Sequence, residues 1–307
     1  MIEVKNLTKL YGERVAINNL NFKVRKGEIV GFLGPNGAGK STTMKIITGH
    51  MAPSQGQVLV DGFDVFEQPI EVKKRIGYLP ENPPVYMDMF VKDYLTFVAN
   101  LKGVNKKQIK ELVEKAIEKT NLQDVSKRMI QNLSKGFRQR VGIAQALVSD
   151  PEILILDEPT VGLDPKQVAE IRKLIQSLKG QHTVVLSTHI LPEVQATCER
   201  IIIINQGQIV AEDTLDSLTT RMQGSKRLHL RIRKVNGVIE KLNKMAGVTS
   251  VQVNGQFMDV DYDGEENTVE NISKLIVNDD AGLLELRHEN IGLEDIFIRL
   301  TSEGGLQ

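Results

Sequence analysis

The chain has 307 residues with 41% hydrophobic content, a length that predicts one main domain and one accessory domain. Its 39 Lys and Arg residues balance 39 Asp and Glu residues, which excludes a global electrostatic field that would draw it to nucleic acid or to an anionic membrane surface. A single cysteine, Cys198, excludes an internal disulfide framework and fits a reducing compartment.

The first 80 residues predict strands separated by turns. The segment at 1–6 alternates polar and apolar residues, which favours a strand, and it lacks the apolar stretch of a secretory signal. Turn signals such as Asn36-Gly37 and Asp61-Gly62 interrupt this region. The longest aliphatic runs, such as 201–204, are far shorter than the ~20 residues of a membrane-spanning helix. We therefore expect any membrane role to require a partner.

A glycine-rich segment at 34–41 reads Gly-Pro-Asn-Gly-Ala-Gly-Lys-Ser and matches the phosphate-binding pattern G-x-x-x-x-G-K-[ST] in full. It follows an apolar strand at 29–33 and precedes a helical run at 42–47, which is the context that the motif requires. Its glycines let backbone N–H groups point at phosphate oxygens. We expect Lys40 to reach the outer phosphates and Ser41 to ligate Mg²⁺. The alternative is a chance match in a glycine-bearing turn, which the flanking strand and helix disfavour.

The middle of the chain predicts helices first and a layered sheet afterwards. At about 82–133, apolar residues recur at helical spacing among lysines and glutamates, which predicts a helical insert. At 152–210, aliphatic strands alternate with a helical stretch near 166–179, and this predicts a parallel sheet covered by helices. After a polar stretch, residues 221–307 predict a small α+β domain. The main domain is thus expected at 1–220.

Two acidic residues, Asp157 and Glu158, end the aliphatic strand that begins at Ile153. Open α/β sheets bind ligands at the carboxyl ends of their strands, so we expect both carboxylates to face the phosphates. Asp157 is expected to hold Mg²⁺, directly or through water, and Glu158 to polarise the water that attacks the γ-phosphorus. His189 follows the next aliphatic strand and is expected to contact the γ-phosphate. The alternatives are a solvated strand end for the acids and a structural histidine.

These motifs occur together with Tyr11, with 133–137 (Leu-Ser-Lys-Gly-Phe) and with 162–164 (Gly-Leu-Asp). In this order they make residues 1–220 resemble the nucleotide-binding subunit of an ATP-binding cassette (ABC) transporter. The resemblance implies an α/β fold: a P-loop ATPase core with a mixed sheet, an antiparallel β subdomain and a helical insert. It also implies that Tyr11 stacks on adenine and that His189 is the switch histidine. A tyrosine packed in the core and an ordinary helix cap at 133–137 are the alternatives.

The resemblance further implies ATP and Mg²⁺ as cofactors and a nucleotide-dependent head-to-tail dimer, with an identical chain or with a second cassette. Each ATP would lie between the phosphate loop of one subunit and the signature segment of the other. Lys135 and Phe137 depart from the usual Leu-Ser-Gly-Gly-Gln signature, and Glu81 replaces the glutamine that usually links Mg²⁺ to the membrane partner. The expected nucleotide contacts are Tyr11, Gly34, Pro35, Asn36, Gly37, Ala38, Gly39, Lys40, Ser41, Thr42, Ser134 and Gly136. The expected Mg²⁺ ligands are Ser41, Asp157 and Glu81, and the expected catalytic residues are Glu158 and His189.

The implied function is that of an ATP-binding and hydrolysing subunit that energises transport through separate integral-membrane permease subunits. Export is implied by a likeness to bacterial multidrug, sodium and gliding-motility systems, carried by 76–81, 134–140 and 293–297. We then expect the subunit in the cytoplasm, held at the inner face of the membrane by its partners, without bound nucleic acid. A cassette acting on ribosomes or DNA is the alternative, which a single cassette without a long coiled coil disfavours. A GTPase is disfavoured because no Asn-Lys-x-Asp motif occurs.

Overall fold

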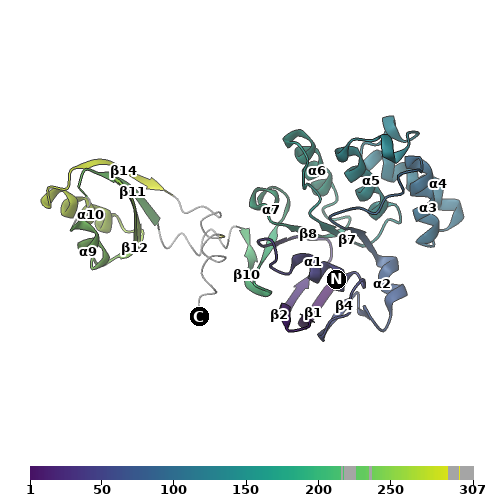
Figure 1. Ribbon diagram of the computed structural model, residues 1–307, viewed down its shortest axis with the longest axis horizontal. Coiled ribbons are helices and arrows are strands. Elements are labelled where there is room, and N and C mark those ends of the chain that lie inside the picture. The colour runs from purple at the N-terminus through teal and green to yellow at the C-terminus, as the bar shows by residue number, and fades with distance from the viewer. Residues whose placement is uncertain (216, 218–225, 235–236, 290–296, 298–307) are drawn as a thin grey trace. The chain divides into compact units, whose positions relative to one another are not determined.

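Figure 1 shows the computed structural model of the chain, which describes residues 1–215, 217, 226–234, 237–289 and 297. The chain divides into two compact units between Asp213 and Thr214. The predicted domain boundary at 220/221, and residues 293–296 of the segment that carried the export likeness, lie outside the described residues. Within the described part, no helix has both the length and the apolarity to cross a bilayer.

A mixed six-stranded sheet forms the centre of the first unit. Its strands are β3 (Ile29–Leu33), β6 (Ile76–Leu79), β7 (Ile153–Asp157), β8 (Thr183–Thr188), β9 (Arg200–Asn205) and β10 (Gln208–Thr214). They lie in the order β10-β9-β3-β8-β7-β6, and the pairs from β9 to β6 are parallel. A two-residue turn joins β9 to β10, so β10 runs antiparallel. β3, β7 and β8 are buried along their whole length, which explains their aliphatic sequences.

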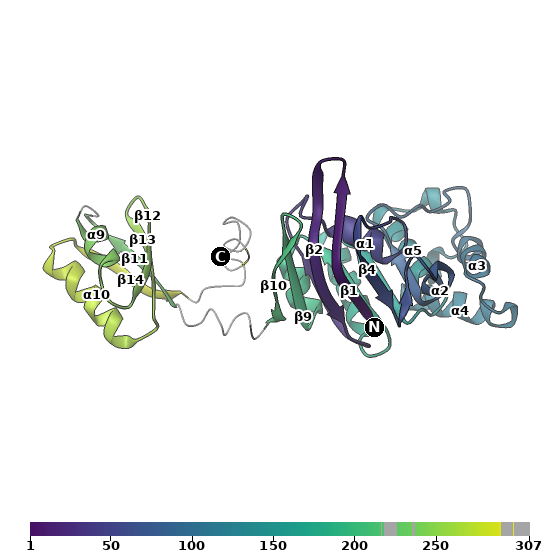
Figure 2. The same ribbon diagram turned by 90° about the horizontal axis from the view of Figure 1, so that it is seen from below.

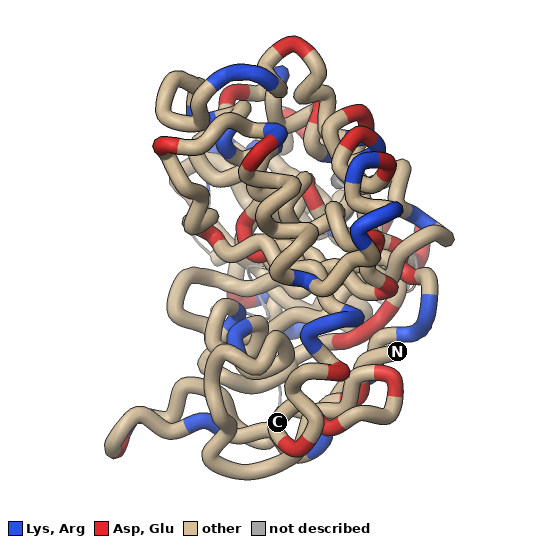
Figure 3. The backbone as a smooth tube through the Cα atoms, turned by 90° about the vertical axis from the view of Figure 1, so that its right-hand side faces the viewer, with Lys and Arg blue, Asp and Glu red and all other residues tan. Residues whose placement is uncertain are grey.

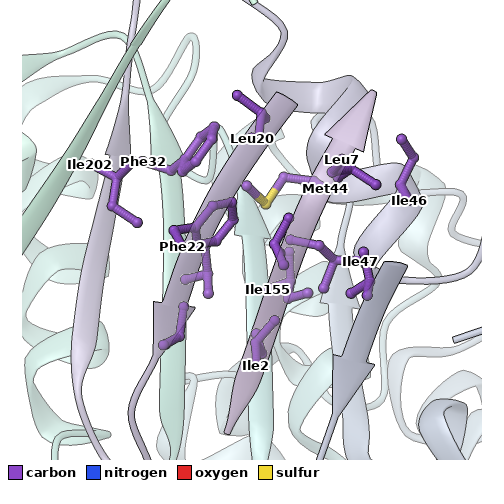
Figure 4. Packing of buried hydrophobic residues seen from close by; sticks show 14 of the residues in the cluster. Ile2, Leu7, Leu20, Phe22, Phe32, Met44, Ile46, Ile47, Ile155 and Ile202 are labelled. Carbon is purple, nitrogen blue, oxygen red and sulfur yellow. The ribbon is translucent and has the colours of Figure 1, made fainter. Parts of the chain in front are cut away.

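An antiparallel sheet covers one face of this central sheet (Figure 2). Its strands, in the order β2-β1-β4-β5, are β1 (Ile2–Tyr11), β2 (Arg14–Val24), β4 (Gln55–Val60) and β5 (Phe63–Asp64). Helix α1 (Lys40–Ile47) lies between the two sheets, and Figure 4 shows Met44 of this helix packed beside Leu7 and Phe22. Each fully buried side chain of this size contributes about 1.5–3 kcal/mol to folding. This core therefore fixes the start of α1 against the sheet edge.

The helical insert has a hydrophobic cluster of its own. Its elements are α3 (Val91–Leu101), α4 (Lys106–Lys119), two short 3₁₀ turns (Gln123–Val125 and Ile130–Asn132) and α5 (Lys135–Leu147). Residues 82–90 of the predicted insert form no helix. α5 also packs on β6 so closely that a Cβ added at Gly77 would lie 2.0 Å from the Ala146 carbonyl oxygen. The insert is thereby tied to the edge of the central sheet.

The remaining helices of the first unit are α2 (Pro69–Arg75), α6 (Pro165–Ser177) and α7 (Leu191–Thr197). Helix α7 lies on the face of the central sheet that the antiparallel sheet leaves open: a Cβ added at Gly31 of β3 would meet Val194 at 2.4 Å. Helix α6 begins after Asp164, whose carboxylate accepts a hydrogen bond from the Gln167 N–H. Basic and acidic residues are interspersed along the backbone (Figure 3).

The second unit is a small α+β fold, in agreement with the sequence pattern. Its elements are β11 (Lys226–Ile232), α9 (Val238–Asn243), β12 (Val248–Asn254), β13 (Phe257–Tyr262), α10 (Glu266–Asn278) and β14 (Leu283–Glu289). The strands form an antiparallel sheet in the order β12-β13-β11-β14. Leu230, Leu242 and Ile272 belong to one cluster, so both helices share a core with the sheet.

Candidate nucleotide-binding site

An open pocket of about 810 Å³ lies where the strands of the central sheet end. Ten residues predicted for the site line it: Tyr11, Asn36, Gly37, Gly39, Lys40, Ser41, Thr42, Glu81, Glu158 and His189. The sequence analysis missed five further lining residues: Arg14, Val15, Ala16, Val161 and Gln206. Arg14, Val15 and Ala16 begin β2, whereas Val161 and Gln206 lie in turns, and none of the five belongs to a motif. Only their nearness in sequence to Tyr11 or Glu158, or to the Gln206-Gly207 turn signal, could have indicated them.

The phosphate loop has a backbone shape that glycine makes possible. Gly37 and Gly39 have φ angles of 81° and 106°, in the region that disfavours other residues. A Cβ added at Gly34 would lie 2.3 Å from the Ile204 carbonyl oxygen, so the loop and β9 touch through their backbones. Helix α1 then begins at Lys40 without a side-chain cap. The N–H groups of its first turn therefore remain available to an anion.

Lys40, Glu158 and His189 meet at one side of this pocket. Nδ1 of His189 lies 2.9 and 3.0 Å from the two carboxylate oxygens of Glu158, to which an Nδ1–H donates. Nζ of Lys40 lies 3.5 Å from the Glu158 carboxylate and donates to the backbone oxygens of Gly34 and Pro35. Glu158 is buried and has a left-handed backbone with φ of 49°, a strained conformation of the kind that clusters at functional sites. The carboxylate is thus held between two cationic or donor groups.

Asp157 is buried beside this group, and its Oδ1 has no hydrogen-bond partner among the described residues. Burial raises the pKa of Asp157; the neighbouring hydroxyls of Ser187 and Ser41 partly offset this rise, and the carboxylates of Glu158 and Glu81 add to it. A cation beside this buried carboxyl group would stabilise its ionised form. Mg²⁺ is bound by one or two carboxylates together with phosphates and water, so Asp157, Ser41 and the pocket residue Glu81 fit that ion.

Tyr11 lies at the end of β1 and is not packed in the core. It is 47% exposed, and its hydroxyl donates to the Met51 sulfur at 2.9 Å. Nζ of Lys9 lies 5.5 Å from its ring centroid. Anchored at its hydroxyl and exposed along the pocket, the ring offers an apolar surface on which a base can stack.

Ser134 and Gly136 do not line this pocket. Ser134 is the N-cap of α5, where its Oγ accepts from the Phe137 N–H at 3.4 Å. Lys135 is exposed and extends over Gly162, since a Cβ there would lie 2.0 Å from its Nζ. Gly34, Pro35 and Ala38 belong to the phosphate loop without lining the pocket either. A single chain therefore does not bring the signature segment to the phosphate loop pocket.

A family model described as ABC transporter matches residues 17–161. The bacitracin transport ATP-binding protein BcrA of Bacillus licheniformis is 33% identical over 308 residues, which cover 99% of this chain and 98% of that protein. The linearmycin resistance ATP-binding protein LnrL of Bacillus subtilis is 30% identical and covers 98% of each chain. A solved dimeric ATP-binding cassette, in a post-hydrolysis state with ADP and Pi, is 28% identical with a TM-score of 0.64, covering 70% of this chain and 99% of that one. The predicted fold class is thereby confirmed.

Proposed function

The chain belongs to the ABC transporter family as an ATP-binding subunit. We propose from the geometry of the pocket which role each of its residues has in ATP binding and hydrolysis. The subunit is an ATPase that energises transport. The relatives give no support to the ribosome or DNA alternative, because those compared are transport and resistance ATP-binding proteins. The observation that carries the assignment of roles is the buried Glu158 carboxylate at the pocket wall, beside both Lys40 and His189.

Glu158 is the general base that orients and polarises the attacking water. The Nδ1–H of His189 fixes the direction of its carboxylate. A second hydrogen bond, from Nε2 of His189 to the γ-phosphate, then requires the doubly protonated ring. Lys40 exchanges the backbone oxygens of its own loop for phosphate oxygens when ATP arrives. Tyr11 stacks on adenine, which leaves discrimination between bases modest.

Ser41, Asp157 and Glu81 would hold Mg²⁺ when it binds with the nucleotide. When bound, the ion neutralises charge on the phosphate oxygens. The unpartnered Oδ1 of Asp157 supports this assignment, because a buried carboxylate oxygen without a donor is otherwise costly. Glu81 adds a charge where the family usually has an amide.

A second subunit completes the site in a head-to-tail dimer, with an identical chain or another cassette. Ser134 and Gly136 lie outside the pocket of their own chain, and α5 starts beside them with only one long side-chain hydrogen bond at its N-terminus. The free N–H groups and dipole of that helix suit an anion in the partner's pocket. The dimeric relative with 28% identity supports this arrangement.

Separate integral-membrane permease subunits dock in a groove of about 930 Å³ between the sheet edge and α3. Aromatic rings of Tyr78, Tyr86 and Phe97 line it together with Lys73 and Lys102. This positive rim favours an acidic segment of the permease. Flanking residues of Glu81 line the groove while Glu81 itself lines the ATP pocket, so docking and hydrolysis share one loop. The subunit then works at the cytoplasmic face of the membrane, and the bacitracin transport and linearmycin resistance relatives support export as its direction.

A Glu158→Gln variant tests the assigned roles. Its amide cannot take the proton of water, so ATP turnover is expected to fall at least 10²-fold while ATP binding is kept. Glu152→Gln is the matched control, since Glu152 is exposed just before the same strand and, within the described part of the chain, its carboxylate pairs with Lys26 at 3.7 Å. Steady-state ATPase rates and equilibrium ATP binding should be measured on both. Wild-type turnover in Glu158→Gln would overturn the assignment.

A further inference from the structure

Glu193, in the first turn of α7, is only 2% exposed. Glutamate is among the residue types that are least often fully buried. The carboxylate forms no ion pair with any described residue. A buried charge without a counter-charge costs several kcal/mol unless hydrogen bonds replace its lost water. Its hydrogen-bond partners therefore indicate why a carboxylate is kept there.

Both carboxylate oxygens of Glu193 accept a threonine hydroxyl. Oε1 accepts from Thr160, and Oε2 accepts from Thr188 at 2.8 Å. Thr160 is 4% exposed and Thr188 is fully buried, so water does not compete for either hydroxyl. Thr188 also accepts a hydrogen bond from the Ile190 N–H at 3.1 Å. The group is thus a satisfied polar network in a dry interior, which is the kind that rigidifies its surroundings.

The two threonines stand beside the two residues assigned to hydrolysis. Thr160 comes two residues after Glu158, and Thr188 directly precedes His189. His189 in turn donates to Glu158 at 2.9 Å. Covalent and hydrogen bonds therefore form a closed ring through Glu158, Thr160, Glu193, Thr188 and His189. Glu193 adds a link from α7 between the loop after β7 and the end of β8, beside the His189–Glu158 contact and the hydrogen bond from the Glu158 N–H to the Ser187 oxygen.

We propose that Glu193 is a positioning residue that holds Glu158 and His189 in register for hydrolysis. This inference rests on the function proposed for those two residues. Glu158 has a left-handed backbone, which persists only where the surrounding structure determines it strongly. The tie from Glu193 to Thr160 supplies such a restraint two residues away. Catalytic groups must be held within about 0.5 Å of their productive geometry. Loss of a hydrogen bond in this ring therefore lowers the rate of hydrolysis more than it lowers the affinity for ATP.

Two near-isosteric variants loosen the ring. Glu193→Gln leaves one acceptor oxygen in place of two, and Thr160→Val removes one hydroxyl. Each is expected to lower kcat by about 10- to 100-fold, by analogy with residues that hydrogen-bond to metal ligands and orient them. ATP affinity is expected to change by less than about twofold, because the lost contact acts on the transition state. The measurements are kcat, KM and the equilibrium dissociation constant of ATP.

Thr197→Val is the matched control on the same helix. The Thr197 hydroxyl donates to the main-chain oxygen of Glu193 at 2.6 Å and does not touch its carboxylate. This variant should keep a kcat near the wild-type value. An equal loss of kcat in Thr197→Val would assign the effect to the packing of α7 and overturn the proposal.

Glu158→Gln, measured in parallel, distinguishes a failure of the positioning role of Glu193 from a failure of the proposed function. If it loses hydrolysis while Glu193→Gln and Thr160→Val keep wild-type kcat, the positioning role is wrong and the proposed function stands. If Glu158→Gln itself turns over at the wild-type rate, the proposed function fails, and this inference fails with it. Loss of kcat at constant ATP affinity in the two ring variants, with the control unaffected, supports the proposal.

Discussion

Gly37 and Gly39 offer a controlled comparison within the phosphate loop. Both have positive φ angles, so an alanine at either position costs about 1–2 kcal/mol in backbone conformation. Their surroundings differ. A Cβ at Gly39 would lie 2.6 Å from Cγ2 of Ile17 and 2.8 Å from the Ala16 carbonyl oxygen, whereas a Cβ at Gly37 would meet nothing within 4 Å. Overpacking adds about 1–3 kcal/mol for Gly39→Ala alone.

Thermal unfolding without nucleotide measures this difference. At about 2–4 °C per kcal/mol for a domain of this size, Gly39→Ala should unfold roughly 2–12 °C below Gly37→Ala. Circular dichroism at matched protein concentration is the assay, with wild type as reference. Equal midpoints for the two variants would refute the reasoning, because they would show that the approach of Gly39 to the β1–β2 hairpin does not constrain the folded chain.

Three further predictions concern the edges of the site. Burial raises the pKa of Asp157, so as pH rises above 3.8 the unfolded chain releases this proton while the folded chain still holds it. The free energy of unfolding therefore falls as pH rises from 3.8 to the raised pKa of the folded state. Nucleotide-free Asp157→Asn should therefore unfold at a higher urea concentration than wild type at pH 7. The difference between the two urea midpoints should shrink below pH 3.8, and a difference that does not change with pH would contradict this. Tyr11→Ala should weaken ATP binding by about 1–3 kcal/mol in calorimetry, while Tyr11→Phe keeps most of it; equal losses would exclude stacking. Lys73→Glu should reduce co-purification with the permease while the exposed control Lys127→Glu does not, and equal recovery would exclude the groove.

The parts of the site that follow one another along the chain were accessible from the sequence. The phosphate loop is a contiguous motif with a strand before it and a helix after it, so its residues are read together. Asp157 and Glu158 end an aliphatic run, and parallel strands bring such ends to one sheet edge. That rule also placed His189 at this edge, where its ring contacts Glu158.

Other parts could not be predicted because nothing local specifies them. Glu193 sits in a helix whose spacing shows neither its burial nor its threonine partners, 33 and 5 residues away. The 82–90 segment lacks helix although it adjoins an amphipathic one, because its prolines and turn pack against α5 and the sheet edge instead. Ser134 is read from a motif, but it does not line the phosphate-loop pocket of its own chain, and the ligand proposed for it belongs to a second subunit.

Sedimentation velocity of the Glu158→Gln protein, with and without Mg-ATP, tests most directly the claim that two subunits complete each ATP site. This variant should hold ATP without hydrolysing it, so the nucleotide that forms much of the interface stays in place. We expect ATP to convert monomer to dimer, and a further Ser134→Arg change to abolish the shift. A protein that binds ATP yet stays monomeric at every concentration tested would contradict the account.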